Sequence, residues 1–312
     1  MLETRKHDWA ERQRKFTEFC IEADCWSGID HQSLESWLRN FPDEEGEYYA
    51  LRLLYRFIYY SEVDTAQLCK HGLFNLLLGK EIMADQISSK FNYSSDELNQ
   101  RLDRELRSSR IVPLLDRDKP YESGPLITRI LVQRLQIPES LIINPGDILE
   151  HVYKGCKRII IIDDCVGSGD QITVFWKRKN LPVGNYKTSL EEMAGKYATV
   201  DFHYLTLVAT ESGIRKAEQA LPVLKIEVCE TLTDEQSVFS ANSRFFESQD
   251  EKERAIDYLQ KLLKDKKISL KGYGGLDYAI AFHHNMPDWS LPLFHKHRSD
   301  WRPLVMRKDS DA

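Results

Sequence analysis

The sequence contains little that would direct the chain to a membrane or to an oxidising compartment. It has no uninterrupted apolar stretch of about 18 residues, the length that a membrane-spanning helix needs. The opening segment MLETRKHDWAERQRKF lacks the apolar core of a signal peptide. The 6 cysteines form no CxxC pair and show no Cys/His spacing of a structural zinc site. We therefore expect a cytoplasmic protein whose thiols are free.

An excess of positive charge is also missing. The chain has 43 Lys and Arg against 49 Asp and Glu, which gives a formal net charge of -6. This balance argues against broad, non-specific attraction to nucleic acid, which depends on many contacts between cations and phosphates. Two short basic stretches, 177–179 and 261–271, are candidates for local patches. Runs of this kind most often form ordinary solvated surface.

What is present is the composition of an ordinary globular protein. Hydrophobic residues make up 42% of the 312 positions and charged residues 29%, so a packed core is expected and disorder is not. A chain of this length can bury one substantial core, or one core with a smaller domain attached.

Residues 1–108 carry helical patterns and no chemistry of their own. The segment DHQSLESWLRNF spaces its apolar residues three and four apart, with Asp30 as a plausible cap. The segment EYYALRLLYRFIYY, residues 47–60, is apolar nearly all round, which is typical of a helix buried between others. A later helix begins with a capping-box pattern of Ser95 and Glu97. We predict a helical domain over this part.

The pattern changes from about residue 109, where short β-branched runs alternate with helical stretches. This alternation is typical of βαβ units, so residues 109–312 are predicted to form a doubly wound α/β domain with a mostly parallel sheet. The run Ile159–Ile162 is predicted to be a central strand, buried on both faces. The predicted strands are 110–115, 140–144, 158–164, 200–209 and 223–230.

Two adjacent carboxylates, Asp163 and Asp164, end this central strand. A buried carboxylate is costly unless it is solvated, paired or linked to a metal, so both side chains need partners. Successive side chains of a strand point to opposite faces, so only one of the two is expected to lie directly against a given ligand face. Ligands of open α/β sheets normally bind where such strands end.

A short loop with two glycines, 165–169, follows the acids and leads into a helix that begins near Asp170. Such a loop lets backbone N–H groups converge on an anion at a helix N-terminus, and Ser168 adds a hydroxyl. The combination suits a sugar phosphate, with carboxylates for ribose hydroxyls and amides for the 5′-phosphate. A plain strand and turn, or another nucleotide-binding α/β fold, are the alternatives.

These residues resemble the signature of type I phosphoribosyltransferases, an apolar run followed by D-D-x-x-x-T-G-x-T. The resemblance implies that the whole segment binds ribose phosphate, and Ser168 is a conservative change for the first Thr. Asp170 and Gln171 depart from the pattern. The corresponding residues here are Asp163, Asp164, Cys165, Val166, Gly167, Ser168, Gly169, Asp170 and Gln171.

A wider resemblance covers most of the chain. The motifs WLRNF, SGPLITR, IDDCVGSG and HHNMPDWSLPLF together resemble the phosphoribosyltransferase-like proteins of bacterial conflict systems. This resemblance implies a role in anti-phage defence, a ligand such as 5-phosphoribosyl diphosphate or a related nucleotide, and Mg²⁺ as cofactor, with indirect help from the two acids. It also implies a defence-system sensor protein or RNA complex as partner. The sequence predicts no oligomeric state.

In the family, a second loop holds pyrophosphate through backbone amides after the first core strand. Ser123 and Gly124 lie in the corresponding order here, with Arg129 one turn further along as a possible charge partner. A plain turn at a helix start, with Pro125 at the first helical position, is the alternative. The segment 210–212 also follows a strand and precedes a helix, so it is expected at the same edge of the sheet.

The C-terminal region is rich in Gly, His, Pro and aromatic residues, and we predict loops that fold back over the sheet as a hood. His283 and His284 could supply a proton acceptor, and Asn285 and Asp288 could contact a base. The same residues could equally join loops together through turns. Metal binding by the C-terminal histidines is disfavoured because no Cys or carboxylate spacing accompanies them.

Two functions from different classes follow. The first is an enzyme that transfers or hydrolyses ribose, with Asp163, Asp164 and His284 as catalytic residues. The second is an inactive nucleotide-sensing or regulatory module that docks on a defence-system partner, which the departures at Asp170 and Gln171 favour. A third possibility makes the helical domain the part that docks.

Overall fold

The computed structural model describes residues 2–114, 124–183 and 186–307. The chain packs into two compact units: unit 1 is Met1–Val63 with Leu232–Ala312, and unit 2 is Asp64–Thr231. Unit 1 is therefore built from both ends of the chain, and unit 2 from its middle. The predicted division into domains 1–108 and 109–312 stays a prediction.

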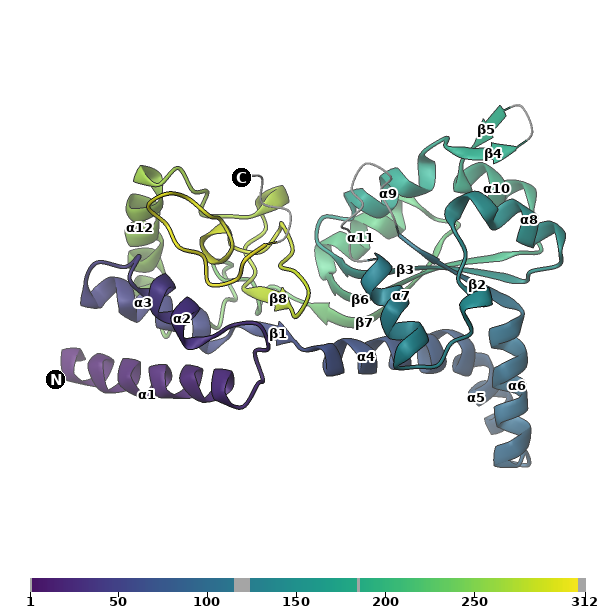
Figure 1. Ribbon diagram of the computed structural model, residues 1–312, viewed down its shortest axis with the longest axis horizontal. Helices are drawn as coiled ribbons and strands as arrows, with labels where there is room; N and C mark the ends of the chain where they lie inside the picture. Colours follow the sequence, from purple (N-terminus) through teal and green to yellow (C-terminus); the bar gives the residue numbers. More distant parts are fainter. Residues whose placement is uncertain (1, 115–123, 184–185, 308–312) are drawn as a thin grey trace. The chain divides into compact units, whose positions relative to one another are not determined.

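Unit 2 contains a four-stranded sheet in the order β2-β3-β6-β7 (Figure 1). Its strands are β2 (Ser109–Pro113), β3 (Arg158–Val166), β6 (Asp201–Thr210) and β7 (Lys225–Leu232). β3 pairs in parallel with β2 on one side and with β6 on the other. The prediction of an α/β fold with a parallel sheet and a buried central strand is thus confirmed, because β3 is internal and almost entirely buried.

Helices cover both faces of this sheet (Figure 1). One face packs against α8 to α11 in a single apolar cluster that includes Ile161 and Trp176. The other face packs against α7 and a π-helical segment, whose Gly72 lies close to Leu205 of β6. The helices are α4 (Glu62–Lys70), the π-helical segment His71–Leu78, α5 (Gly79–Ser88), α6 (Ser95–Arg107), α7 (Gly124–Gln133), α8 (Ile148–Tyr153), α9 (Asp170–Lys177), α10 (Leu190–Lys196) and α11 (Glu211–Ala220). A small hairpin joins β4 (Leu181–Val183) to β5 (Tyr186–Thr188).

The strand predicted at 140–144 is wrong. Glu139–Leu141 is a short 3-10 helix, and only Ile142 makes an isolated parallel bridge, to Ile111 of β2. Pro138 and Pro145 bound this segment, and a proline cannot donate a ladder hydrogen bond.

The caps of two helices test the predicted helix starts. Asp30 caps its helix as predicted, by accepting a hydrogen bond from the backbone of Ser33 at 2.7 Å. The capping box of α6 uses Ser94 rather than Ser95, with Glu97 as its partner.

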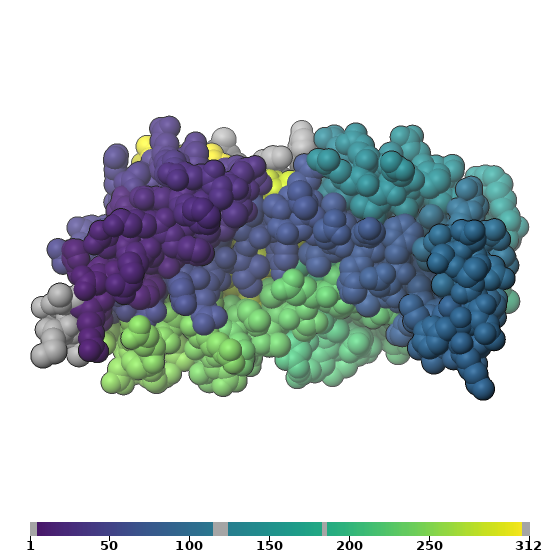
Figure 2. All heavy atoms as spheres, turned by 90° about the horizontal axis from the view of Figure 1, so that it is seen from below, coloured from purple at the N-terminus to yellow at the C-terminus, as the bar shows by residue number. Residues whose placement is uncertain are grey.

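In the space-filling view, α6 protrudes in dark blue from the surface of unit 2 (Figure 2). Only Leu106 of this helix is buried.

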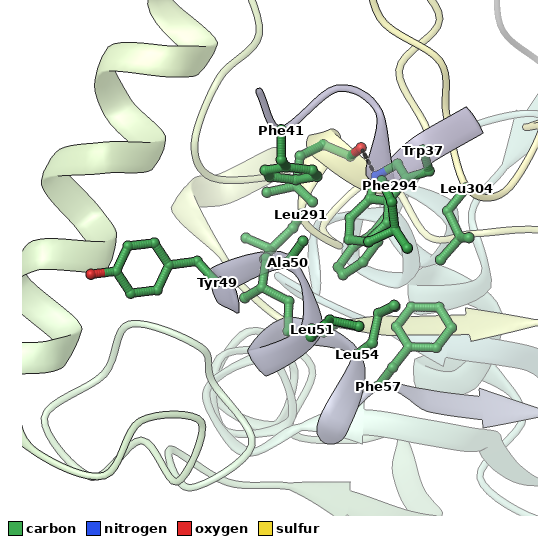
Figure 3. Close-up of a cluster of buried hydrophobic side chains, with 14 of the residues drawn as sticks. Trp37, Phe41, Tyr49, Ala50, Leu51, Leu54, Phe57, Leu291, Phe294 and Leu304 are labelled. Carbon is green, nitrogen blue, oxygen red and sulfur yellow. Dashed lines mark hydrogen bonds between the residues drawn. The ribbon is translucent and has the colours of Figure 1, made fainter. Parts of the chain in front are cut away.

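Unit 1 joins N-terminal helices to C-terminal loops around one apolar core (Figure 3). Trp37 stacks on Phe294 with ring centroids 5.2 Å apart and donates from its indole to the carbonyl of Leu293 at 2.9 Å. The elements of this unit are α1 (Leu2–Glu22), α2 (His31–Leu38), α3 (Glu44–Tyr55), β1 (Ile58–Tyr60), α12 (Gln249–Asp265), the 3-10 turns Tyr273–Gly275 and Pro292–Phe294, and β8 (Ile280–Phe282). The aromatic and proline-rich C-terminal residues thus form core as well as loops.

The helix predicted at 47–60 ends earlier than its apolar pattern does. α3 stops at Tyr55, and Ile58–Tyr60 forms β1, which pairs in parallel with β8. Ile58 and the two tyrosines after it are residue types that favour strands. An all-apolar run cannot distinguish a buried helix from a buried strand, so the boundary was not visible in the sequence.

Candidate ribose-phosphate site

β3 delivers the two acids to the carboxyl edge of the sheet of unit 2. Asp163 is only 2% exposed, and both of its oxygens accept hydrogen bonds from protein donors. Tyr204 of β6 donates its hydroxyl at 3.2 Å, and the backbone N–H of Asp164 donates at 3.0 Å. Burial, and then the charge of Asp163, raises the pKa of Tyr204 well above its ordinary value, so this phenol stays a donor. The partners of Asp163 fix its orientation.

Asp164 is 8% exposed and lies on the other face of β3. Its carboxylate accepts the backbone N–H of Cys165 at 2.8 Å. Burial, the neighbouring Cys229 and then the charge of Asp164 raise the pKa of Cys69, on the helix α4. These contacts agree with the expectation that the two acids point to opposite faces of the strand.

The loop after β3 is anchored to the start of α11. Thr210 donates its hydroxyl to the carbonyl of Gly167 at 2.6 Å and accepts the backbone N–H of Gly213 at 3.0 Å. Gly169 has φ of +77°, and a Cβ there would lie 2.7 Å from the carbonyl oxygen of Gly213. A Cβ on Gly213 would lie 2.1 Å from the carbonyl oxygen of Gly167. Both glycines are required because the two backbones approach this closely.

Asp170, the first residue of α9, is held by two partners. The Ser168 hydroxyl donates to one carboxylate oxygen at 2.8 Å, and Lys216 of α11 donates to the other at 2.7 Å. The ammonium of Lys216, and then the Ser168 hydroxyl, lower the pKa of this carboxyl. The negative charge that departs from the family signature is therefore matched by a cation from the next helix.

Two residues of this arrangement were not predicted as site residues. Tyr204 reads in the sequence as one more apolar position of a strand, and Lys216 as an exposed helical cation. Their roles depend on the register between β3 and β6 and on the packing of α11 against α9. In the sequence, the start of α11 was indicated as part of the carboxyl edge of the sheet only by the strand–loop–helix order around 210–212.

The predicted pyrophosphate loop falls between β2 and α7. Gly124 is buried as the first residue of α7, and Arg129 is exposed on the same helix. Thr128 donates its hydroxyl to the carbonyl of Gly124 at 2.9 Å, an interaction within the first turn of the helix. Ser123 lies outside the described residues.

The predicted acceptor residues belong to unit 1. The backbone N–H of His283 donates to the carbonyl of Tyr60 at 2.8 Å, and the rings of His283 and His284 meet edge to face at 4.8 Å. The side-chain oxygen of Asn285 accepts a hydrogen bond from the backbone N–H of the next residue, Met286, at 2.8 Å. The carbonyl of Asp288 accepts a backbone N–H from the Tyr273 turn at 2.9 Å. The side chain of Asn285 thus stabilises a local turn, and the backbone of Asp288 joins its loop to the Tyr273 turn.

Over the ranges that the structure describes, no three His, Cys, Asp or Glu side chains come together as a metal site. No helix there combines the length and the apolar character needed to cross a bilayer.

Comparisons with known proteins place the chain in a family. Among solved structures, it is similar to orotate phosphoribosyltransferase from Aeropyrum pernix, with 17% identity over 53% of this chain and 68% of that one, at a TM-score of 0.25. It is also similar to the AQ2163 protein of Aquifex aeolicus, with 10% identity over 66% and 86% of the two chains and a TM-score of 0.29. No curated protein matches the sequence. The PRTase-CE family model matches residues 34–307, so the chain belongs to this family of phosphoribosyltransferases of conflict systems.

Proposed function

We propose that unit 2 binds 5-phosphoribosyl diphosphate, or a related ribose phosphate or nucleotide, at the carboxyl end of β3. The chain then transfers or hydrolyses the ribose as an effector of bacterial anti-phage defence. The observation that carries this proposal is the anchored loop 167–169, which directly follows two buried carboxylates. Membership of the conflict-system family supports the defence role.

The phosphate of the ligand binds at the loop and the first turn of α9. Backbone N–H groups at a helix start attract an anion, and the anchoring on α11 keeps the loop in one conformation. Lys216 supplies the positive charge. Lys216 and Ser168 now donate to the carboxylate of Asp170. When phosphate binds, they donate to phosphate oxygens instead.

The two acids have different roles in this proposal. Asp163 already accepts hydrogen bonds at both oxygens, so it positions the strand end. Asp164, on the other face of the strand, accepts the Cys165 amide and contacts a ribose hydroxyl in this proposal. As the bond from C1′ to pyrophosphate breaks, its electron pair leaves with pyrophosphate. The oxocarbenium-like ribose is then attacked by a nitrogen acceptor or by water.

The remaining predicted residues complete the proposal. Ser123, Gly124 and Arg129 would hold the pyrophosphate. The hood of C-terminal loops stays a prediction, with His284 as the proton acceptor and His283, Asn285 and Asp288 as acceptor-pocket residues.

Mg²⁺ fits this site only together with the ligand. The described residues near β3 offer two carboxylates, each with an oxygen committed to a protein donor, which is too few for a cation held by protein alone. Asp163 and Asp164 would therefore hold the ion indirectly, through ligand oxygens or water. When bound, such an ion would supply positive charge that favours the departure of pyrophosphate.

A second function, a nucleotide sensor without turnover, is favoured by one observation. Asp170 satisfies the Ser168 hydroxyl and the Lys216 ammonium with its own carboxylate, so the loop is stable without a phosphate. Such a loop could report the presence of a ligand to a defence-system partner without using it in chemistry.

Titration calorimetry with 5-phosphoribosyl diphosphate and Mg²⁺, paired with an assay of pyrophosphate release on the full chain, separates these functions. The enzyme is supported by release that disappears in Asp164→Asn and falls in Asp163→Asn. Binding without release supports the sensor. Glu211→Gln, an exposed acid at the start of α11 that pairs with Arg215, is the matched control and should behave like the wild type. A chain that binds no ribose phosphate contradicts both functions.

A further inference from the structure

The N-terminal helix α1 has one side packed on unit 1 and another side in water. Gln13, Thr17 and Cys20 are each at most 8% exposed, so the side that they share faces the interior of the unit, where α1 packs on α3. The helix itself lies at the surface, in purple in the space-filling view (Figure 2). Its water-exposed side is therefore available to a partner.

Two phenylalanines lie next to each other on the water-exposed side. Phe16 is 50% exposed and Phe19 is 59% exposed. Because residues three apart on a helix are neighbours, their rings form one apolar surface. Single exposed apolar residues are common, but an adjacent pair of phenyl rings on one helix is a candidate interaction surface.

The two rings belong to a regular row of exposed residues. We call this row, Arg12, Phe16, Phe19 and Ala23, the α1 seam, and all four residues are exposed. The backbone N–H of Ala23 donates to the carbonyl of Phe19 at 2.9 Å, so the helical spiral reaches the last residue of the row. The spacing of four, three and four is that of the contact positions d, a, d and a of a coiled coil. Such a row packs against a second helix.

The α1 seam is complementary to itself when two copies of the helix run in opposite directions. If Phe16 of one copy packs against Phe19 of the other, Arg12 lies opposite Ala23, whose small side chain leaves room for it. In a parallel pair, Arg12 would lie against Arg12 of the other copy, and the two like charges would repel. The seam therefore favours the antiparallel pair.

The charges beside the seam follow the same symmetry. Lys15 and Glu22 each come directly before an a position, so both are g positions, which carry the ion pairs of coiled coils. In the antiparallel pair, Lys15 of each copy lies beside Glu22 of the other. Their present partners are Glu11 at 2.7 Å and His31 at 3.6 Å, in exposed pairs that contribute little and can exchange.

From this match we infer that α1 is a self-association surface, through which two copies of the chain pair with their α1 helices antiparallel. Phe16 packs against Phe19 at the centre, and Lys15 pairs with Glu22 on the flank. A protein of another sequence could cover the two rings, but the complementarity of the seam and its flanking charges under two-fold symmetry favours a second copy. A single pair of helices is a small interface, so we expect dissociation in the micromolar range.

Sedimentation equilibrium of the full chain at about 1 to 100 μM tests the inference. We expect the average mass to rise with concentration from 36.5 kDa toward twice that value. The double variant Phe16→Ser, Phe19→Ser should remain a monomer at every concentration. Phe91→Ser, at a 67% exposed phenylalanine of unit 2, is the matched control and should associate like the wild type.

A charge exchange tests the antiparallel arrangement. Lys15→Glu and Glu22→Lys should each weaken association by about tenfold, because two-fold symmetry turns two attractive pairs into two repulsive ones. The double variant Lys15→Glu, Glu22→Lys restores both pairs and should associate like the wild type. A chain that stays a monomer at about 100 μM overturns the inference. A dimer that persists without both phenylalanines also overturns it, as does a charge exchange that fails to restore association.

Discussion

In the proposed function, the ion pair between Lys216 and Asp170 affects the affinity of the loop after β3 for phosphate. Lys216→Met removes the cation and should weaken the binding of 5-phosphoribosyl diphosphate by about tenfold, since it removes one charge-assisted contact to phosphate. Asp170→Asn should strengthen binding, because it removes a negative charge that competes for Lys216 and Ser168. Titration calorimetry measures both effects.

Arg215→Met is the control for Lys216→Met. Arg215 is the neighbouring cation on α11, but it pairs with Glu211 one turn away along the same helix. Its loss should leave the affinity unchanged. Equal losses at Arg215 and Lys216 would mean that α11 contributes only general positive charge, and that the pairing with Asp170 has no part in binding.

A buried histidine makes the stability of unit 2 depend on pH. Burial lowers the pKa of His203 to about 4, with the cations Arg158, Lys225 and Lys80 acting in the same direction and Asp201 against them. The folded state keeps the ring neutral, whereas the unfolded state protonates it near pH 6.5. Stability is therefore complete above about pH 6.5 and falls by about 3 kcal/mol as the pH drops to 4. His203→Leu should flatten this fall, as measured by urea denaturation at a series of pH values.

His71→Leu, at an exposed histidine of the same unit, is the control and should leave the pH dependence unchanged. His295 in unit 1 behaves like His203, because burial and then the Arg307 cation lower its pKa to about 3. Some acid sensitivity should therefore remain in His203→Leu. A stability profile of that variant that coincides with the wild type would contradict the prediction.

At the scale of elements, α6 depends on its cap more than on its packing. Ser94 accepts the backbone N–H of Glu97, whose carboxylate in turn accepts the backbone N–H of Ser94 at 2.7 Å. Because only Leu106 is buried, Ser94→Ala should destabilise the helix by about 1 kcal/mol. Hydrogen exchange along α6 should then be faster. Ser95→Ala should have almost no effect, and equal effects at the two serines would contradict the capping box.

The elements also show how far sequence patterns reach. Four of the five predicted strands form within a few residues of their predicted bounds, because β-branched runs report burial in a sheet directly. The fifth, at 140–144, lies between prolines and makes a single bridge. The acids and the glycine loop were visible because strand, loop and helix are continuous in the sequence. Tyr204 and Lys216 were not, since their contacts depend on strand register and helix packing.

At the scale of the whole molecule, the core of unit 1 joins residues from both ends of the chain (Figure 3). Trp37 and Trp301 both donate from their indoles to the carbonyl of Leu293, at 2.9 and 3.0 Å. Helical periodicity predicted that Trp37 would be buried, but it carries no information about which distant segment buries it. The C-terminal loops read as irregular in the sequence because their regularity lies in these long-range contacts.

The same unit contains a buried ion pair that links α3 to α12. Arg52 donates to Glu251 at 3.3 Å and to Tyr48 at 3.0 Å, and Tyr48 also donates to Glu251. Glu251→Gln keeps the shape of the side chain but removes its charge. The buried Arg52 guanidinium is then left with Glu247, a 74% exposed partner, so unit 1 should lose about 3 kcal/mol of stability. Glu247→Gln should cost less than about 1 kcal/mol, because water can replace an exposed partner. Urea denaturation of the two variants would contradict this account if their midpoints shifted equally.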